Sequence, residues 1–325
     1  MDNNFFQPRT DLSQLSYAVN NIRQNIGNIV VGQHKMVDLI IAGLLSDGHI
    51  LIEGVPGIAK TLTAKLLSKT VDTHFSRIQF TPDLMPSDVL GTSVFNPREG
   101  NFQFKPGPIF SNIVLIDEIN RAPAKTQAAL FEVMEERQVS IDGTTYTMNP
   151  PFIVLATQNP IEQEGTYRLP EAQLDRFLFK IDIGYPTLQE EITILQNQQT
   201  TTASEQLAQI QPILYAQDLA NYRNIVKGLT IENKLIEFIA KLVAATRNNP
   251  SLYLGASPRA SLSILKASKA MAAIRGRDFV IPEDIIEVVP HVLRHRIILT
   301  PEKEMEGLTP DELITKLIQG VEVPR

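Results

Sequence analysis

The sequence has no cysteine among its 325 residues, which excludes disulfide bonds, thiol catalysis and thiolate metal sites. Basic residues are also outnumbered, with 30 Lys and Arg against 36 Asp and Glu and a formal net charge of −6. A surface built mainly to neutralise nucleic-acid phosphates needs the opposite balance, although one local basic patch is compatible with these totals. Nucleic acid is therefore disfavoured as the main partner.

Long apolar runs are missing as well. The longest early run, residues 37–45, is interrupted by Asp38 and is far too short to cross a bilayer. The N-terminal MDNNFFQPRT lacks a basic segment followed by an apolar one, so no secretory signal is visible. The composition, 43% hydrophobic and 20% charged, is that of a soluble globular protein. We therefore expect a cytoplasmic protein without membrane insertion.

Five short apolar runs rich in β-branched residues predict strands in the first part of the chain. They are residues 49–53 (HILIE), 75–80 (FSRIQF), 113–118 (IVLIDE), 152–159 (FIVLATQN) and 179–184 (FKIDIG). Helical segments such as 60–69 and 123–137 separate most of them. Buried strands that alternate with helices indicate a doubly wound α/β domain with a five-stranded parallel sheet, over residues 1–186.

Residues 187–325 show helical periodicity and no further strand-like run of comparable quality. Near the end, Thr309-Pro310 has the pattern of an N-cap followed by a first-turn proline. These features predict a smaller, all-helical second domain. Its polar stretch 196–206 is the most loop-like segment.

Two segments of the first domain predict hairpins, at about residues 94–108 and 139–148. The first has the polar stretch REGN between arms that carry aromatic residues, and the second contains Asp142-Gly143, a strong two-residue turn signal. Such hairpins at the rim of an α/β domain could be decorative insertions or could grip a partner.

The strand HILIE runs directly into GVPGIAKT and then into a helix, which is the context that a phosphate-binding loop requires. Backbone N–H groups and the helix dipole face the phosphates in such a loop. Lys60 is expected to reach the β- and γ-phosphates and the Thr61 hydroxyl to bind Mg²⁺. Ala59 replaces the usual glycine before the lysine, a small restriction on the backbone. The expected nucleotide-binding residues here are Gly54, Val55, Pro56, Gly57, Ile58, Ala59, Lys60, Thr61 and Leu62.

Polar side chains also end two of the other strands. Asp117 and Glu118 close an apolar run, and burying carboxylates is unfavourable unless a cation pairs with them. We expect Asp117 to hold Mg²⁺ through its water shell and Glu118 to orient and polarise the attacking water. Asn159, after the strand FIVLATQ, could position the same water, because ligands sit at the carboxyl ends of strands in open α/β sheets.

With these elements in order, the sequence resembles the AAA+ superfamily of ATPases, and closely its MoxR family. The blocks that carry the resemblance are GVPGIAKT, IVLIDEINRAPAKTQAALFEVMEER, LATQNPIEQEGTYRLPEAQLDRFLFK and GASPRA. The resemblance covers most of the chain, from VGQ at residues 31–33 to the helical domain. It implies a P-loop core with a helical lid, and Ala59 is similar to what that family uses.

The resemblance also implies roles for particular residues. The matched positions are Lys60 and Thr61 for Walker A, Asp117 and Glu118 for Walker B, and Asn159 for sensor 1. Val31 and Gly32 resemble the stretch beside the adenine. Arg259, in SPR, matches the sensor 2 arginine of the lid.

A further arginine is implied to act on a neighbouring subunit. Arg176, in LDRF, matches the arginine finger that reaches the ATP of the next subunit. Arg121 and Arg168 compete for this role, because both are expected in loops near the same rim.

The function implied by the resemblance is chaperone-like. Such a protein hydrolyses ATP with Mg²⁺ in a ring-shaped homo-oligomer, here expected to be hexameric, and remodels or activates a protein target. A separate protein with a von Willebrand factor A domain is the implied partner, and the two predicted hairpins match inserts of this branch. A chelatase-type motor and a nucleic-acid-directed motor such as a helicase stay open as alternatives. The acidic charge and the lack of a Lys/Arg cluster in either hairpin disfavour the latter.

Overall fold

The computed structural model describes residues 10–54, 60–159, 166–200 and 203–324, which form two compact units. One unit, Ile22–Leu219, contains the large sheet. The other comprises the described residues up to Asn21, together with those from Ala220 onward. Within the described ranges, no helix has the length and apolar character needed to cross a membrane.

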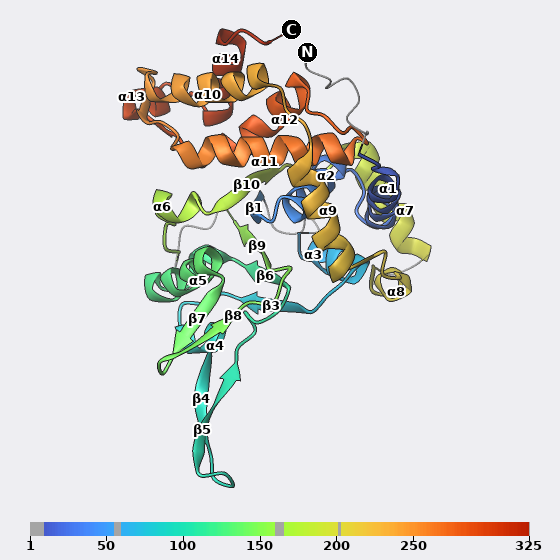
Figure 1. Ribbon diagram of the computed structural model, residues 1–325, viewed down its shortest axis with the longest axis vertical. Helices are drawn as coiled ribbons and strands as arrows, with labels where there is room; N and C mark the ends of the chain where they lie inside the picture. The colour runs from blue at the N-terminus through green and yellow to red at the C-terminus, as the bar shows by residue number, and fades with distance from the viewer. Residues whose placement is uncertain (1–9, 55–59, 160–165, 201–202, 325) are drawn as a thin grey trace, which may run out of the picture. The chain divides into compact units, whose positions relative to one another are not determined.

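Five parallel strands form the central sheet of the first unit (Figure 1). In sheet order they are β10 (Phe177–Ile183), β1 (His49–Gly54), β9 (Ile153–Gln158), β6 (Ile113–Asp117) and β3 (Phe75–Gln79). Every neighbouring pair runs parallel. The predicted five-stranded parallel sheet is confirmed, and each strand lies within two residues of its predicted bounds.

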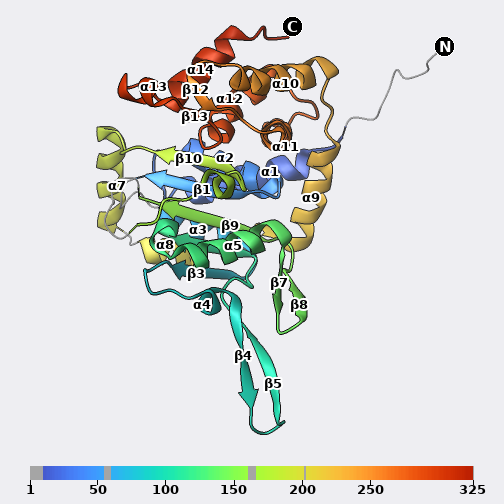
Figure 2. The ribbon, with the colours of Figure 1, turned by 90° about the vertical axis from the view of Figure 1, so that its left-hand side faces the viewer.

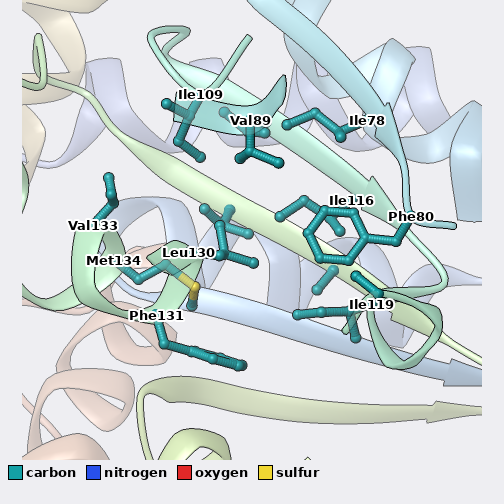
Figure 3. Packing of buried hydrophobic residues seen from close by; sticks show 14 of the residues in the cluster. Ile78, Phe80, Val89, Ile109, Ile116, Ile119, Leu130, Phe131, Val133 and Met134 are labelled. Carbon is teal, nitrogen blue, oxygen red and sulfur yellow. The ribbon is translucent and has the colours of Figure 1, made fainter. Parts of the chain in front are cut away.

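Helices cover both faces of the sheet. The helices α2 (His34–Leu45) and α3 (Lys60–Thr70) contact β1, β10 and β6 on one face, while α4 (Pro86–Leu90) and α5 (Ala124–Glu136) close the apolar cluster on the other (Figure 3). Val114 and Ile116 of β6 belong to that cluster. Because side chains alternate along a strand, Leu115 and Asp117 point to the face covered by α3.

The structure contains a hairpin at each predicted position. The strands β4 (Gly91–Asn96) and β5 (Asn101–Pro106) pair antiparallel, as do β7 (Gln138–Ile141) and β8 (Thr144–Thr147). Asp142 and Gly143 have φ values of 50° and 77°, as a tight two-residue turn requires. The β4–β5 hairpin extends away from the sheet beyond β3 (Figures 1 and 2). Phe104 stacks on Tyr146 with 4.2 Å between ring centroids, so the two hairpins contact each other.

Residues 187–219 group with the sheet unit. They form α7 (Leu188–Thr200), α8 (Ala203–Gln209) and the short strand β11 (Leu214–Tyr215), which pairs with β2 (Val71–Asp72). The prediction of a loop at 196–206 is wrong, because the described residues of this stretch are helical. Glutamine and glutamate are good helix formers, so polarity did not indicate a loop. A functional division at residue 186 stays a prediction.

The second unit is mainly helical. Its helices are α10 (Asn233–Arg247), α11 (Pro258–Ile274), α12 (Pro282–Leu293), α13 (Pro301–Met305) and α14 (Pro310–Gly320). Two short strands, β12 (Leu252–Leu254) and β13 (Ile298–Leu299), pair antiparallel. The Thr309 hydroxyl accepts a hydrogen bond from the Glu312 N–H, which confirms the predicted N-cap of α14. The helices α1 (Ser13–Gly27) and α9 (Ala216–Gly228) each contribute residues to both units.

Candidate functional site

Three predicted site segments meet at one edge of the sheet. β9 lies between β1 and β6, so the carboxyl ends of these strands are neighbours. Lys60, Asp117 and Asn159 follow or close these three strands, and the edge is the usual ligand position of an open α/β sheet. The predicted phosphate-binding residues Val55 to Ala59 lie outside the described residues, between the end of β1 and the start of α3.

Lys60 opens α3 and points back to the end of β1. Its ammonium group donates a hydrogen bond to the Gly54 carbonyl oxygen at 2.6 Å. Burial lowers the pKa of Lys60, and the negative charges of Asp117, Glu118 and Glu53 act in the opposite direction. A cationic amine close to three carboxylates suits a site that binds a polyanion together with a metal ion.

Asp117 is held from three sides. One carboxylate oxygen, Oδ1, faces the Thr61 hydroxyl at 3.4 Å and accepts a hydrogen bond from the Thr157 hydroxyl at 3.2 Å. The other oxygen, Oδ2, lies 2.6 Å from the Arg77 Nε. The Asp117 side chain is 9% exposed, so its negative charge is stabilised by these partners more than by bulk water.

Glu118 leaves the strand in a left-handed backbone conformation with φ 58° and ψ 53°. This conformation costs about 1–2 kcal/mol in a residue other than glycine, so neighbouring contacts must fix it. The Glu118 N–H donates to the Thr157 hydroxyl at 3.1 Å. Its carboxylate accepts from the Gln79 amide at 2.9 Å and pairs with Arg121 at 3.1 Å. The two adjacent acids therefore have different side-chain partners and can serve different purposes.

The oxygen atoms around Asp117 fit a magnesium ion. Mg²⁺ prefers oxygen ligands and is commonly bound by one or two carboxylates together with substrate phosphates and water. Thr61 and Asp117 supply a hydroxyl and a carboxylate that already face each other. The predicted metal ligands are thus brought together from α3 and β6.

Asn159, Val31, Gly32 and Leu62, four further predicted site residues, also belong to the sheet unit. Asn159 is buried directly after β9. Gly32 has a φ of 79°, and a Cβ at this position would overlap the carboxylate of Glu190 in α7. The backbone angle therefore favours glycine at this position, and a larger residue would also have to displace the Glu190 carboxylate. Val31 precedes it, and Leu62 follows Thr61 in α3.

Arg176 makes intramolecular contacts immediately before β10. Its Nε lies 2.8 Å from a carboxylate oxygen of Glu135 near the end of α5. A second nitrogen, Nη1, donates to the Ala172 carbonyl oxygen at 3.3 Å, and the guanidinium lies 6.0 Å from the centre of the Phe131 ring. The candidate finger is thus anchored to α5 of its own chain.

The other candidate arginines have different surroundings. Arg168 is 87% exposed, and its guanidinium lies 3.5 Å from Glu171, the first residue of α6 (Glu171–Leu174). Arg121 ends the short helix η1 (Ile119–Arg121) and pairs with Glu118 of the same chain. Arg259 is the second residue of α11 and belongs to the other unit.

Three residues at the site were not singled out from the sequence, namely Arg77, Gln79 and Thr157. All three contact Asp117 or Glu118. In FSRIQF, Arg77 and Gln79 alternate with Ile78 and Phe80, which belong to the apolar cluster. This alternation was a usable signal, because it places the two polar side chains on the face that Asp117 shares.

Two family descriptions match the chain. Residues 49–179 match the ATPase family associated with various cellular activities (AAA). Residues 244–317 match the AAA lid domain.

Similar proteins match over nearly the whole chain. Chaperone MoxR1 of Mycobacterium tuberculosis is 46% identical over 309 residues, which cover 92% of this chain and 81% of that protein. The uncharacterized protein YeaC of Bacillus subtilis is 44% identical over 301 residues, covering 93% of each chain. A crystal structure of a candidate ATPase from Cytophaga hutchinsonii has a TM-score of 0.88 and 44% identity, and covers 96% of this chain and 97% of its own.

Proposed function

Because the chain belongs to the MoxR family of AAA+ ATPases, we propose that it hydrolyses ATP with Mg²⁺ to remodel or activate a protein target. The observation that carries this proposal is the approach of Thr61 to Asp117, whose Oγ1 and Oδ1 atoms lie 3.4 Å apart. Lys60 and Glu118 are the chain neighbours of these two residues. A hydroxyl, two carboxylates and an ammonium group therefore converge from a helix start and a strand end.

The start of α3 is proposed to bind the phosphates. The N-terminus of α3 supplies the positive potential that phosphates favour, and Lys60 adds a full positive charge. Thr61 and Asp117 would hold Mg²⁺, which, when bound, neutralises charge on the phosphoryl group. Val31 and Gly32 are proposed to lie beside the adenine.

Glu118 and Asn159 are proposed to act in the hydrolysis step. Glu118 is proposed to orient and deprotonate the attacking water, since it is the acid that Thr61 does not contact. Asn159, buried at the end of the neighbouring strand β9, is proposed to position that water from the other side.

The proposed working form is a cytoplasmic ring-shaped homo-oligomer, hexameric by analogy with the family, that acts with a von Willebrand factor A domain protein. The hairpin β4–β5 supports contact with a protein target, because Phe95 and Phe102 are both exposed, Phe102 by 72%. Aromatic side chains of this kind are enriched in protein interfaces. The high identity to a protein named as a chaperone favours protein remodelling over the chelatase and nucleic-acid alternatives.

Replacing Lys60 by alanine tests nucleotide binding. We expect ATP affinity to fall by about ten- to a hundredfold, the scale of losing hydrogen bonds to a charged group, and turnover to fall with it. Isothermal titration with ATP measures the first effect and phosphate release the second. Lys65→Ala is the matched control, because Lys65 lies in the same helix. The Lys65→Ala protein should bind ATP normally. A Lys60→Ala protein that binds ATP as well as its parent would contradict the proposed site.

Replacing Arg259 by alanine tests the sensor 2 assignment, which rests on the SPR match. We propose that Arg259 reads the γ-phosphate, so its loss should weaken the discrimination between ATP and ADP. The ratio of the ADP and ATP dissociation constants is the measurement. Lys241→Ala, at an exposed position of α10, is the control. An unchanged ratio in Arg259→Ala would remove the sensor role.

A further inference from the structure

Arg77 forms an ion pair with the carboxylate that is proposed to bind the metal ion. Its Nε lies 2.6 Å from Asp117 Oδ2, while the hydroxyls of Thr61 and Thr157 face Oδ1. The guanidinium thus contacts one oxygen of the carboxylate, and the two hydroxyls contact the other. Arg77 is 47% exposed although Asp117 is 9% exposed, so the arginine can leave this position into water without losing a buried environment.

The strand register explains how Arg77 reaches Asp117. In the pairing of β3 with β6, Arg77 lies opposite Leu115 and Gln79 lies opposite Asp117. Arg77 is therefore the diagonal neighbour of Asp117 on the same face of the sheet, within reach of a long side chain. Ile78, between the two polar residues, is buried in the apolar cluster on the opposite face. The contact is built into the sheet and does not depend on a loop.

We propose that Arg77 is a positioning residue that competes with Mg²⁺ for Asp117 and releases Oδ2 when the metal–nucleotide complex binds. This inference rests on the proposed function, since it takes Asp117 as a metal ligand. Two cations that are stabilised by the same carboxylate repel each other, so each lowers the affinity of the site for the other. Arg77 thereby raises the Mg²⁺ concentration that the site requires and keeps the carboxylate paired until the complex arrives.

The Arg77→Gln variant separates this role from a purely structural one. Without the guanidinium, Asp117 should bind the metal more readily, and the Mg²⁺ concentration for half-maximal nucleotide binding should fall by about fivefold or more. Affinity for the nucleotide in EDTA should change little. The unfolding temperature should fall in the nucleotide-free protein, because a mostly buried carboxylate loses its partner, and less so with the metal–nucleotide complex bound.

The experiment uses the full chain and a fluorescent, non-hydrolysable ATP analogue. Binding is measured in EDTA and then during a MgCl₂ titration, and thermal unfolding is followed under both conditions. Arg137→Gln is the matched control: Arg137 pairs with Asp47 at 2.9 Å, and Asp47 lies just before β1, at the opposite end of the strand from Lys60. The Arg137→Gln variant should lose similar stability in EDTA and in MgCl₂, and it should keep the parental Mg²⁺ requirement. If Arg77→Gln folds poorly, Arg77→Lys is measured in its place. Arg77→Lys retains the charge and should give an intermediate Mg²⁺ requirement.

An Mg²⁺ requirement that is unchanged or higher in Arg77→Gln would overturn the competition, as would the same shift in Arg137→Gln. These results are distinct from failure of the proposed function. If the parent protein bound no nucleotide in either EDTA or MgCl₂, the proposed function itself would fail. If it bound nucleotide normally and the Mg²⁺ requirement of Arg77→Gln did not fall, only the role of Arg77 would be lost.

Discussion

A Glu118→Gln protein is expected to bind ATP at the parental affinity while its turnover falls by at least about a hundredfold, the effect of losing a positioned general base. The substitution keeps the shape of the side chain and removes its ability to take a proton. Gln79 and Arg121 both donate to one carboxylate oxygen of Glu118, and an amide oxygen can accept the same hydrogen bonds. The surrounding structure should therefore be retained.

Phosphate release and equilibrium binding of ATP measure the two halves of this expectation. Glu132→Gln is the control, because Glu132 is exposed in α5 and should keep normal turnover. Parental turnover in Glu118→Gln would show that another group activates the water. The ATP-bound form that this variant should accumulate is also suited to retaining the protein target, which could then be identified after affinity purification.

The sheet and the acids of the site were predictable because they depend on local sequence. A short apolar run rich in β-branched residues, such as IVLID, predicts a buried strand, and polar residues at its end are expected at the sheet edge. Alternation along β6 then places Asp117 on the face that α3 covers.

Other features depend on contacts that are distant in sequence. Arg77 and Thr157 meet at Asp117 only because β3 and β9 both flank β6, an order that the sequence does not state. The left-handed backbone of Glu118 likewise depends on the Thr157 hydroxyl, which lies on a neighbouring strand. The pairing of β11 with β2 holds residues near 214 against the sheet unit, although their local pattern is helical on both sides.

Arg176 and Arg168 are candidates for the arginine that is proposed to act between subunits. Arg176 matches the family pattern, but its guanidinium is held by Glu135 and lies over the ring of Phe131. Arg168 is far more exposed. A substitution of Arg176 therefore removes both a candidate finger and an intramolecular ion pair, and an experiment must distinguish these two losses.

We expect Arg176→Ala to keep ATP binding and to lose about 10³- to 10⁵-fold in turnover, the range for an arginine finger in phosphoryl transfer. The reason is that phosphoryl transfer spreads negative charge over the γ-phosphate, and an added guanidinium stabilises that charge. Mixing Arg176→Ala with Lys60→Ala should restore part of the activity. In such a mixture, the intact phosphate loop of the first variant can meet the intact arginine of the second.

Two further variants decide what a loss of turnover means. In the parent, Arg176 Nε lies 2.8 Å from a carboxylate oxygen of Glu135. Glu135→Gln breaks this ion pair, as Arg176→Ala does, but leaves the arginine in place. If Arg176 acts in trans, Glu135→Gln should retain turnover, whereas a structural role would make the two variants behave alike.

Arg168→Ala tests the exposed competitor and should have little effect. A large loss in Arg168→Ala, with normal turnover in Arg176→Ala, would transfer the role to Arg168. Activity that stays independent of protein concentration and is not rescued by mixing would contradict a site shared between subunits, because a finger supplied in trans requires two chains to meet.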